Sequence, residues 1–482
     1  MSGPVQEGVG AVERVERVRG GTIWTENGPV VGDLVIDQEG RIAALVPDAG
    51  RGGGADGGGD APGSGGGRII DASGLWVLPG AVDVHVHFRE PGLTESEDFL
   101  SGSAAAACGG VTTVLDMPNT LPPVSDGAAL AAKLEAVRGR SYVDYGLFGA
   151  AVAGGEETLA ARVEELASLG ACGIKVFLGP TTGDIAAPGW GALYELCRRW
   201  AGSGLVFAFH CEDRDVIRRA AAEEAHLDPE DYRSLLFLRP RFGELLATDG
   251  ALRLARETGA RVHIAHVALK EAVEAIARAK EDGAPVTAET CPHYLLLDEG
   301  DYAAVGRAMK ALPPVRARED REALWRGLRE GIIDAVATDH APHRVPGRRG
   351  EPVWSPPFGV AGVQSLVPLL VDAAARGLCR VEQVVRWTSA NPARAYGLYP
   401  RKGRLEPGAD ADLVVIDPRA RWRIERPWWK SKSANTPFWG REGLGAPVCT
   451  LVRGWVVAER GEVVGPPRGE LLRPRERKAP PV

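Results

Sequence analysis

Eight short apolar runs, separated by longer stretches of helical composition, constrain the fold of this chain more than any other feature. The runs span residues 81–88, 111–117, 143–150, 173–178, 205–211, 261–267, 284–290 and 334–338. Ala- and Leu-rich segments with helical periodicity, such as 271–279 and 321–330, lie between them. Eight strand–helix repeats predict a closed parallel (β/α)8 barrel of the TIM type, whose active site lies at the C-terminal ends of the strands.

Both ends of the chain show a different pattern, in which short β-prone runs alternate with turns. These runs span 21–24, 31–36, 41–46 and 68–77 near the N-terminus, and 411–416, 448–452 and 455–458 near the C-terminus. We therefore expect one small β-sandwich domain built from residues 1–77 and 396–482, and a catalytic barrel at 78–395. Residues 50–67 are mostly Gly, Ala, Asp and Pro, a composition that predicts a flexible loop.

The composition narrows the class of function. The net charge of -7 gives no basic surface for nucleic acid, and no apolar run is long enough to span a membrane. We therefore expect a small-molecule substrate. The seven cysteines are scattered, odd in number and without a CxxC pair, which argues against a disulfide framework. Together with the lack of a signal-peptide pattern, this favours a cytoplasmic protein, which we also expect to form a homo-oligomer.

The positions of the histidines indicate a metal site. His85 and His87 are two residues apart on the first barrel strand, so their side chains point to the same face and can share one ion. His210 ends the fifth strand, His266 ends the sixth, and Asp339 ends the eighth. Neutral imidazoles with one carboxylate are the ligands expected for zinc or a similar ion.

Lys175 is the one charged residue in the apolar run at 173–178. A buried ammonium is costly, so this lysine must reach solvent or find a partner. Near metal ions there is a third possibility, because burial makes a neutral amine available, and that amine can react with carbon dioxide to give a carbamate that bridges two cations. The spacing alone does not decide between these alternatives.

Several motifs resemble the amidohydrolase superfamily, in its cyclic amidohydrolase branch of dihydroorotases, allantoinases and hydantoinases. The resemblance spans nearly the whole chain and is carried by residues 83–92 (DVHVHFREPG), 117–120 (MPNT), 210–213 (HCED), 289–294 (ETCPHY), 337–343 (ATDHAPH) and 408–413 (GADADL).

The resemblance implies two divalent metal ions, with zinc as the expected metal. It places His85, His87 and Asp339 on the more buried ion and His210 and His266 on the other, with Lys175, N6-carboxylated as a carbamate, as the bridge between them. His263 has the opposite strand parity to His266, so we interpret it as structural. Glu212 is expected to lie behind the metal ligands or to face solvent.

Three further residues favour dihydroorotase, which reversibly hydrolyses dihydroorotate to N-carbamoyl-aspartate in pyrimidine biosynthesis. Arg89, Asn119 and His343 match positions at which dihydroorotases hold the substrate carboxylate and ring, and residues 435–438 (NTPF) resemble a stretch near the dihydroorotase C-terminus. Arginine suits a carboxylate because its planar fork can bind both oxygens. In this interpretation Asp339 is also the catalytic residue that takes and returns the proton.

Two other residues favour allantoinase or hydantoinase. Tyr294 resembles the allantoinase pattern, and Leu312 stands where bacterial dihydroorotases commonly have an asparagine. A non-catalytic scaffold with the same fold is a second alternative. Such relatives have usually lost metal ligands, and none is missing here.

Overall fold

The barrel expected from the eight apolar runs is present in the computed structural model, which describes residues 14–48, 67–182, 185–344 and 350–474. Each run contains a strand or a pair of strands. They are β6 (Ala81–Val86), β7 (Val111–Asp116), β8 (Asp144–Leu147) with β9 (Gly149–Ala150), β10 (Ile174–Phe177), β11 (Val206–His210), β12 (Arg261–Ile264), β13 (Val286–Thr290) and β14 (Ala335–Val336).

Hydrogen bonds between parallel strands arrange the barrel in two arcs, β6-β7-β8 and β9-β10-β11-β12-β13-β14. The chain passes from the first arc to the second at Phe148, between β8 and β9. The ring closes where Val86 bridges His340 in parallel register and the His87 N–H donates to the His340 carbonyl at 2.8 Å. Thr338 reinforces this seam, because its N–H and hydroxyl both donate to the Asp83 carboxylate, at 3.0 and 2.5 Å.

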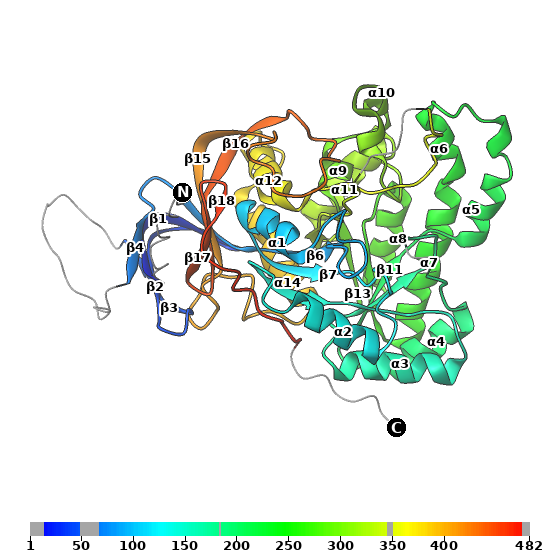
Figure 1. Cartoon of the computed structure of the whole chain (residues 1–482), viewed down its shortest axis with the longest axis horizontal. Helices are drawn as coiled ribbons and strands as arrows, with labels where there is room; N and C mark the ends of the chain where they lie inside the picture. Colours follow the sequence, from blue (N-terminus) through cyan, green and yellow to red (C-terminus); the bar gives the residue numbers. More distant parts are fainter. Residues whose placement is uncertain (1–13, 49–66, 183–184, 345–349, 475–482) are drawn as a thin grey trace, which may run out of the picture.

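Helices follow the barrel strands and cover the outside of the ring (Figure 1). They are α1 (Phe99–Cys108), α2 (Gly127–Val137), α3 (Glu156–Ser168), α4 (Trp190–Arg199), α5 (Arg214–Ala221), α6 (Tyr232–Leu238), α7 (Arg241–Thr258), α8 (Lys270–Glu281), α9 (Pro292–Leu296), α10 (Tyr302–Val305), α11 (Arg318–Glu330), α12 (Leu366–Ala375), α13 (Val381–Val385) and α14 (Asn391–Ala395). No helix in the described part of the chain is long and apolar enough to cross a membrane.

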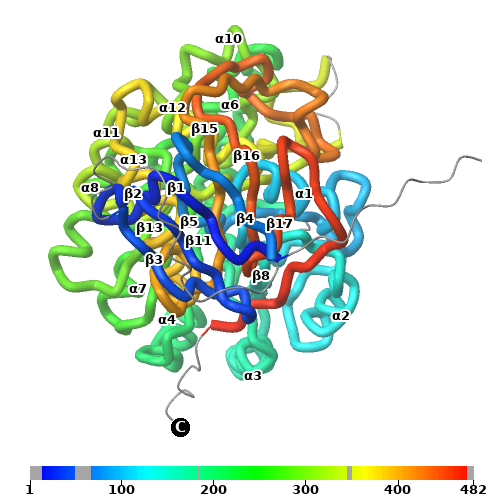
Figure 2. The backbone as a smooth tube through the Cα atoms, turned by 90° about the vertical axis from the view of Figure 1, so that its left-hand side faces the viewer, coloured from blue at the N-terminus to red at the C-terminus, as the bar shows by residue number. Residues whose placement is uncertain are grey.

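A second, mostly antiparallel sheet joins the two ends of the chain, as expected. Its strands are β1 (Val15–Thr25), β2 (Gly28–Ile36), β3 (Ile42–Pro47), β4 (Arg68–Asp71), β5 (Trp76–Pro79), β15 (Leu413–Arg423), β16 (Glu442–Val452), β17 (Trp455–Glu459) and β18 (Glu462–Val463). The N-terminal strands, in blue, lie beside the C-terminal strands, in orange and red, because β5 pairs with β15 (Figure 2).

This sheet has its own apolar core, formed mainly by residues of β1, β2, β3, β5, β15, β16 and β17. The domain boundaries at 77 and 395 stay a prediction. Of the expected flexible loop at 50–67, all but Gly67 lies outside the described residues.

A buried charge cluster links the barrel to this sheet. The Lys402 ammonium lies 2.5 Å from the Asp144 carboxylate at the start of β8, and 2.8 and 2.7 Å from those of Asp410 and Asp412 before β15. Arg453, just after β16, also contacts Asp144. Burial disfavours the charged ammonium, but the three carboxylates outweigh this and hold the pKa of Lys402 above its usual value.

We expect Lys402→Met to lower the free energy of unfolding by about 3–5 kcal/mol, because it leaves carboxylates buried without their cation. Guanidinium unfolding followed by circular dichroism measures this. Arg198→Met is the control, since Arg198 forms an exposed ion pair with Glu195, and its loss should lower the free energy of unfolding far less. Equal effects of the two substitutions would contradict a role for Lys402 in joining the domains.

Candidate metal centre

The six predicted metal ligands lie together at the C-terminal ends of the barrel strands. All six line one cavity of about 350 Å³, which also contains the three predicted substrate-binding residues. Lys175 lies on β10 and His210 ends β11, whereas the remaining ligands are His85 on β6 and residues that follow β6, β12 and β14, namely His87, His266 and Asp339.

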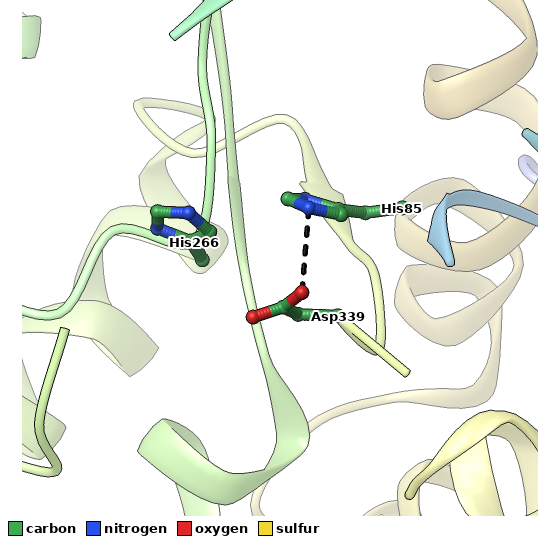
Figure 3. Close-up of side chains that lie close together, drawn as sticks. All are labelled: His85, His266 and Asp339. Carbon is green, nitrogen blue, oxygen red and sulfur yellow. Dashed lines mark ion pairs between the residues drawn. The ribbon is translucent and has the colours of Figure 1, made fainter. Parts of the chain in front are cut away.

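One group of ligands surrounds the Asp339 carboxylate. Its Oδ1 atom lies 3.3 Å from His85 Nε2 and 3.0 Å from His87 Nε2. Figure 3 shows the His85 and His266 rings and the Asp339 carboxylate turned toward one another, and one ligand atom from each lies within 4.8 Å of the others.

The other nitrogen of each of the first two histidines is already occupied. His85 Nδ1 lies 2.5 Å from Glu289 Oε1, and His87 Nδ1 lies 2.6 Å from Asn119 Oδ1. A carboxylate or carbonyl oxygen only accepts, so both Nδ1 atoms carry the proton. Both Nε2 lone pairs therefore face the Asp339 oxygen.

A second group contains His210 and His266. His210 Nε2 donates to Glu212 Oε2 at 2.9 Å, so its Nδ1 lone pair is free and faces His266 Nε2 at 3.0 Å. His266 Nδ1 is buried without a hydrogen-bond partner.

These contacts bring metal-ligating nitrogen and oxygen atoms together at two points of the cavity. Lone pairs of His85, His87 and Asp339 converge at one point, and those of His210 and His266 can meet at another. A cation at each point would satisfy them, and imidazole nitrogens with a carboxylate suit zinc and related ions. The residues present therefore fit two divalent ions.

Lys175 lies beside the first of these two groups. Its Nζ atom is buried and lies 3.5 Å from His85 Nε2. Burial lowers the pKa of Lys175 from 10.5 to about 8. A substantial fraction of the amine is therefore neutral near physiological pH, which is the form that can become a carbamate.

Asp339 is ionised at neutral pH. Burial alone would raise its pKa, but the neighbouring imidazoles of His85 and His87 outweigh burial and hold the pKa of Asp339 well below its usual value. Burial also lowers the pKa of His87, to about 3, so that this imidazole is neutral. A charged carboxylate and neutral imidazoles are the protonation states that bind metal ions.

Three residues at the strand ends have left-handed backbone angles. The φ values are 62° for Arg89, 38° for His266 and 46° for Asp339. This conformation is unfavourable for non-glycine residues and occurs preferentially at functional sites. It turns the chain sharply after the strand and directs the side chains into the cavity.

Two acidic residues hold the histidines of this cluster: Glu289, which was not predicted from the sequence, and Glu212, which was expected either to lie behind the ligands or to face solvent. Glu289, at the end of β13, accepts from His85 and, through Oε2, from His263 at 3.1 Å. His263 thus has the structural role expected. Glu212 is buried and also accepts from Arg239 at 3.1 Å. A signal for Glu289 was present, since a glutamate ending an apolar run is unusual.

Arg89 and His343 lie side by side in the cavity wall. Arg89 is buried, its Nε atom donates to the Pro342 carbonyl at 3.2 Å, and its Nη2 atom lies 3.2 Å from His343 Nε2. The carboxylate of the next residue, Glu90, forms an ion pair with Arg140. Burial lowers the pKa of Arg89 to about 10, so the guanidinium stays charged at neutral pH.

Asn119 forms two hydrogen bonds that its position in the sequence did not indicate. Besides holding His87 through Oδ1, its Nδ2 atom donates to Thr181 Oγ1 at 3.2 Å. Leu312 lines the cavity, as do Phe358 and Gly359. Tyr294 does not line the cavity. Its hydroxyl donates to the Pro313 carbonyl at 2.5 Å.

Comparisons with known proteins agree with this geometry. Residues 76–457 match the model of the amidohydrolase family. The allantoinase of Rubrobacter xylanophilus is 39% identical over 469 residues, covering 96% of this chain and 98% of the relative. The dihydroorotase of Halobacterium salinarum is 40% identical over 392 residues, covering 81% and 88%.

Among solved structures, the L-hydantoinase (dihydropyrimidinase) of Arthrobacter aurescens superimposes with a TM-score of 0.88 at 31% identity, covering 96% of this chain and all of that one (100%). The expected fold, a barrel with a small β-sandwich domain, is thereby confirmed. The chain therefore belongs to the amidohydrolase family, and it is a metal-dependent hydrolase of cyclic amides.

Proposed function

We propose that this enzyme is a dihydroorotase, which interconverts dihydroorotate and N-carbamoyl-aspartate. The observation that carries the proposal is the buried Arg89 guanidinium, whose Nη1 atom has no hydrogen-bond partner although it is shielded from water. A buried cation needs an anionic partner, and a carboxylate on the substrate ring would supply it.

The surroundings of Arg89 support an anion rather than a neutral group. His343 Nε2 lies 2.6 Å from the Phe358 carbonyl, which only accepts, so this nitrogen is a donor and cannot accept from Arg89. Burial lowers the pKa of His343 to about 3 and keeps the ring neutral. The Nη1 and Nη2 donors of Arg89 are therefore left for a ligand in the cavity, while Nε donates to the Pro342 carbonyl.

The residues of the metal centre suit hydrolysis of a ring amide. When bound, two divalent ions would be held by His85, His87, His210, His266, Lys175 as a carbamate, and Asp339, and would supply hydroxide near neutral pH. Asp339, ionised and within the cluster, would accept the proton of the attacking nucleophile and return it to the departing ring nitrogen. Arg89 would hold the ring so that its amide carbonyl faces the cluster.

We expect Lys175→Ala to bind fewer metal ions than the about two per chain of the wild type and to lose most activity, because the bridging ligand is gone. Elemental analysis and turnover assays measure both. Added short-chain carboxylic acids should restore part of the activity by replacing the carbamate. Lys270→Ala, at the start of α8 and outside the cavity, is the control. Full activity and metal content in Lys175→Ala would refute the bridging role.

Arg89→Met should lower kcat/KM for dihydroorotate by about 10- to 100-fold, since a charged hydrogen bond is worth roughly 1.5–3 kcal/mol. Metal content should not change. The same substitution should matter little for allantoin or hydantoins, which have no carboxylate at that position. An equal loss with all substrates would show that Arg89 acts on the fold of the cavity instead.

Allantoinase is the second candidate. Leu312 lines the cavity with an apolar side chain, and an apolar wall tolerates an uncharged ring such as allantoin better than it complements the polar, charged dihydroorotate. The similarity to the Rubrobacter xylanophilus allantoinase also extends over nearly the whole of both chains. Assays of the metal-loaded wild type with dihydroorotate, N-carbamoyl-aspartate, allantoin and hydantoins decide between them. Turnover of allantoin with none of dihydroorotate in either direction would rule out the proposed function.

We also propose that the enzyme is a cytoplasmic homo-oligomer. All seven cysteines are buried and none forms a disulfide, which suits a reducing compartment. Exposed apolar side chains lie on the outer helices α4, α6 and α7, and they are Trp190, Tyr194, Phe237, Phe242 and Leu246. Such exposure is typical of protein interfaces.

Phe242 has the most exposed of these side chains, at 64%. We therefore expect Phe242→Glu to shift the mass measured by light scattering toward the monomer, with Val31→Glu in β2 as the control. A monomeric wild type would contradict the oligomer.

A further inference from the structure

One short segment of the C-terminal part of the chain reaches the rim of the metal cavity. Residues 431–435, here called the latch, lie between β15 and β16 of the mostly antiparallel sheet. The side chains of Ser431, Ser433 and Asn435 are all buried. Asn435 also begins the stretch 435–438 that resembles dihydroorotases, and the proposed reaction gives none of the three side chains a role.

Two side chains of the latch donate hydrogen bonds to backbone carbonyls of the cavity wall. Ser433 Oγ donates to the His343 carbonyl at 2.8 Å. Asn435 Nδ2 donates to the Gly359 carbonyl at 2.6 Å, and the backbone carbonyl of Asn435 accepts from the Ala361 N–H at 2.8 Å. The latch therefore forms hydrogen bonds with both His343 and Gly359.

The residues held in this way line the cavity. His343 and Gly359 are lining residues, as is Phe358, whose carbonyl accepts from His343 Nε2 at 2.6 Å. The Gly359 N–H donates to the Lys310 carbonyl at 2.8 Å, two residues before Leu312. Gly359 has a φ of 144°, and a Cβ at this position would collide with Ala341. Its position is therefore set through its backbone hydrogen bonds.

The latch is itself anchored to the barrel. Ser431 Oγ donates to Glu97, and Lys432 Nζ lies 2.8 Å from Asp98 Oδ2, the carboxylate group of the residue that caps the start of α1. The donors of Ser433 and Asn435 are thus fixed relative to the strand ends on which the metal ligands lie.

We propose that Ser433 and Asn435 are positioning residues for substrate binding: by holding His343 and Gly359, they set the distance between the His343–Phe358 wall and Arg89. This inference rests on the proposed binding of the substrate ring between Arg89 and the metal centre. Neither residue lines the cavity or contacts a metal ligand. Their loss should therefore weaken substrate binding while the hydrolytic step stays intact.

The test uses Ser433→Ala, Asn435→Ala and Asn435→Asp in the full-length, metal-loaded enzyme. Asn435→Asp is nearly isosteric but places a carboxylate oxygen against the Gly359 carbonyl, so it removes the donor without removing volume. We expect each variant to raise KM for dihydroorotate at least tenfold, to change kcat by less than threefold, and to retain the wild-type metal content.

Matched controls exist at the opposite end of the barrel. Ser141 is buried and its hydroxyl donates to the Val143 carbonyl at 2.6 Å, while Asn391 Nδ2 donates to the Asp334 carbonyl at 2.9 Å. Ser141→Ala and Asn391→Ala remove the same types of bond, so they report the cost of losing such a bond anywhere in the fold. Both should retain the wild-type KM.

A second measurement follows the wall directly. Hydrogen exchange of the peptide covering residues 353–362 should be faster in the latch variants than in the wild type, and unchanged in the controls. Should Asn435→Ala not fold, Ser433→Ala, which removes a single hydroxyl, carries the test.

Wild-type KM in the latch variants, or a loss confined to kcat or to metal content, would overturn the proposal. The proposed function is refuted by a separate result: wild-type enzyme that does not act on dihydroorotate. The latch is then tested with the ring that the wild type does hydrolyse, because Phe358 and Gly359 line the cavity whichever ring occupies it.

Discussion

The convergence of electron-pair donors at one end of the barrel is the constraint on which the rest of the structure depends. Nitrogen lone pairs of His85 and His87 face the ionised Asp339 at 3.3 and 3.0 Å, and all three side chains are largely buried. Without a cation this arrangement is repulsive, so rigid elements must impose it. Strand ends impose it, and residues behind them, such as Glu289, fix which nitrogen of each ring is available.

The backbone at this end of the barrel is strained as well. His266 and Asp339 have positive φ values, 38° and 46°, although neither is a glycine. A relaxed strand would carry such side chains along the barrel wall, whereas the left-handed turn directs them across the opening. Such a conformation persists where the surrounding structure over-determines it, and it is concentrated at functional sites.

The sequence predicted the parts of this protein that depend on local periodicity. Buried parallel strands are apolar on both faces, so the runs at 81–88 and 205–211 indicated strands directly, and the i, i+2 spacing of His85 and His87 followed from strand geometry. Contacts between segments that are far apart in the sequence could not be predicted from local periodicity. The bond from Arg239 to Glu212, the approach of Phe358 to His343, and the latch all join residues that no local pattern relates.

The sheet that joins the two chain ends has a consequence for how the protein is made. Val77 on β5 pairs with Val415 on β15, so the partner of an N-terminal strand is among the last parts of the chain to be synthesised. On the ribosome, β5 therefore stays an open edge until most of the barrel has been translated, and pairings so distant in sequence form slowly. The segment between β15 and β16, which bonds to His343 and Gly359 in the wall of the cavity, emerges later still than β15.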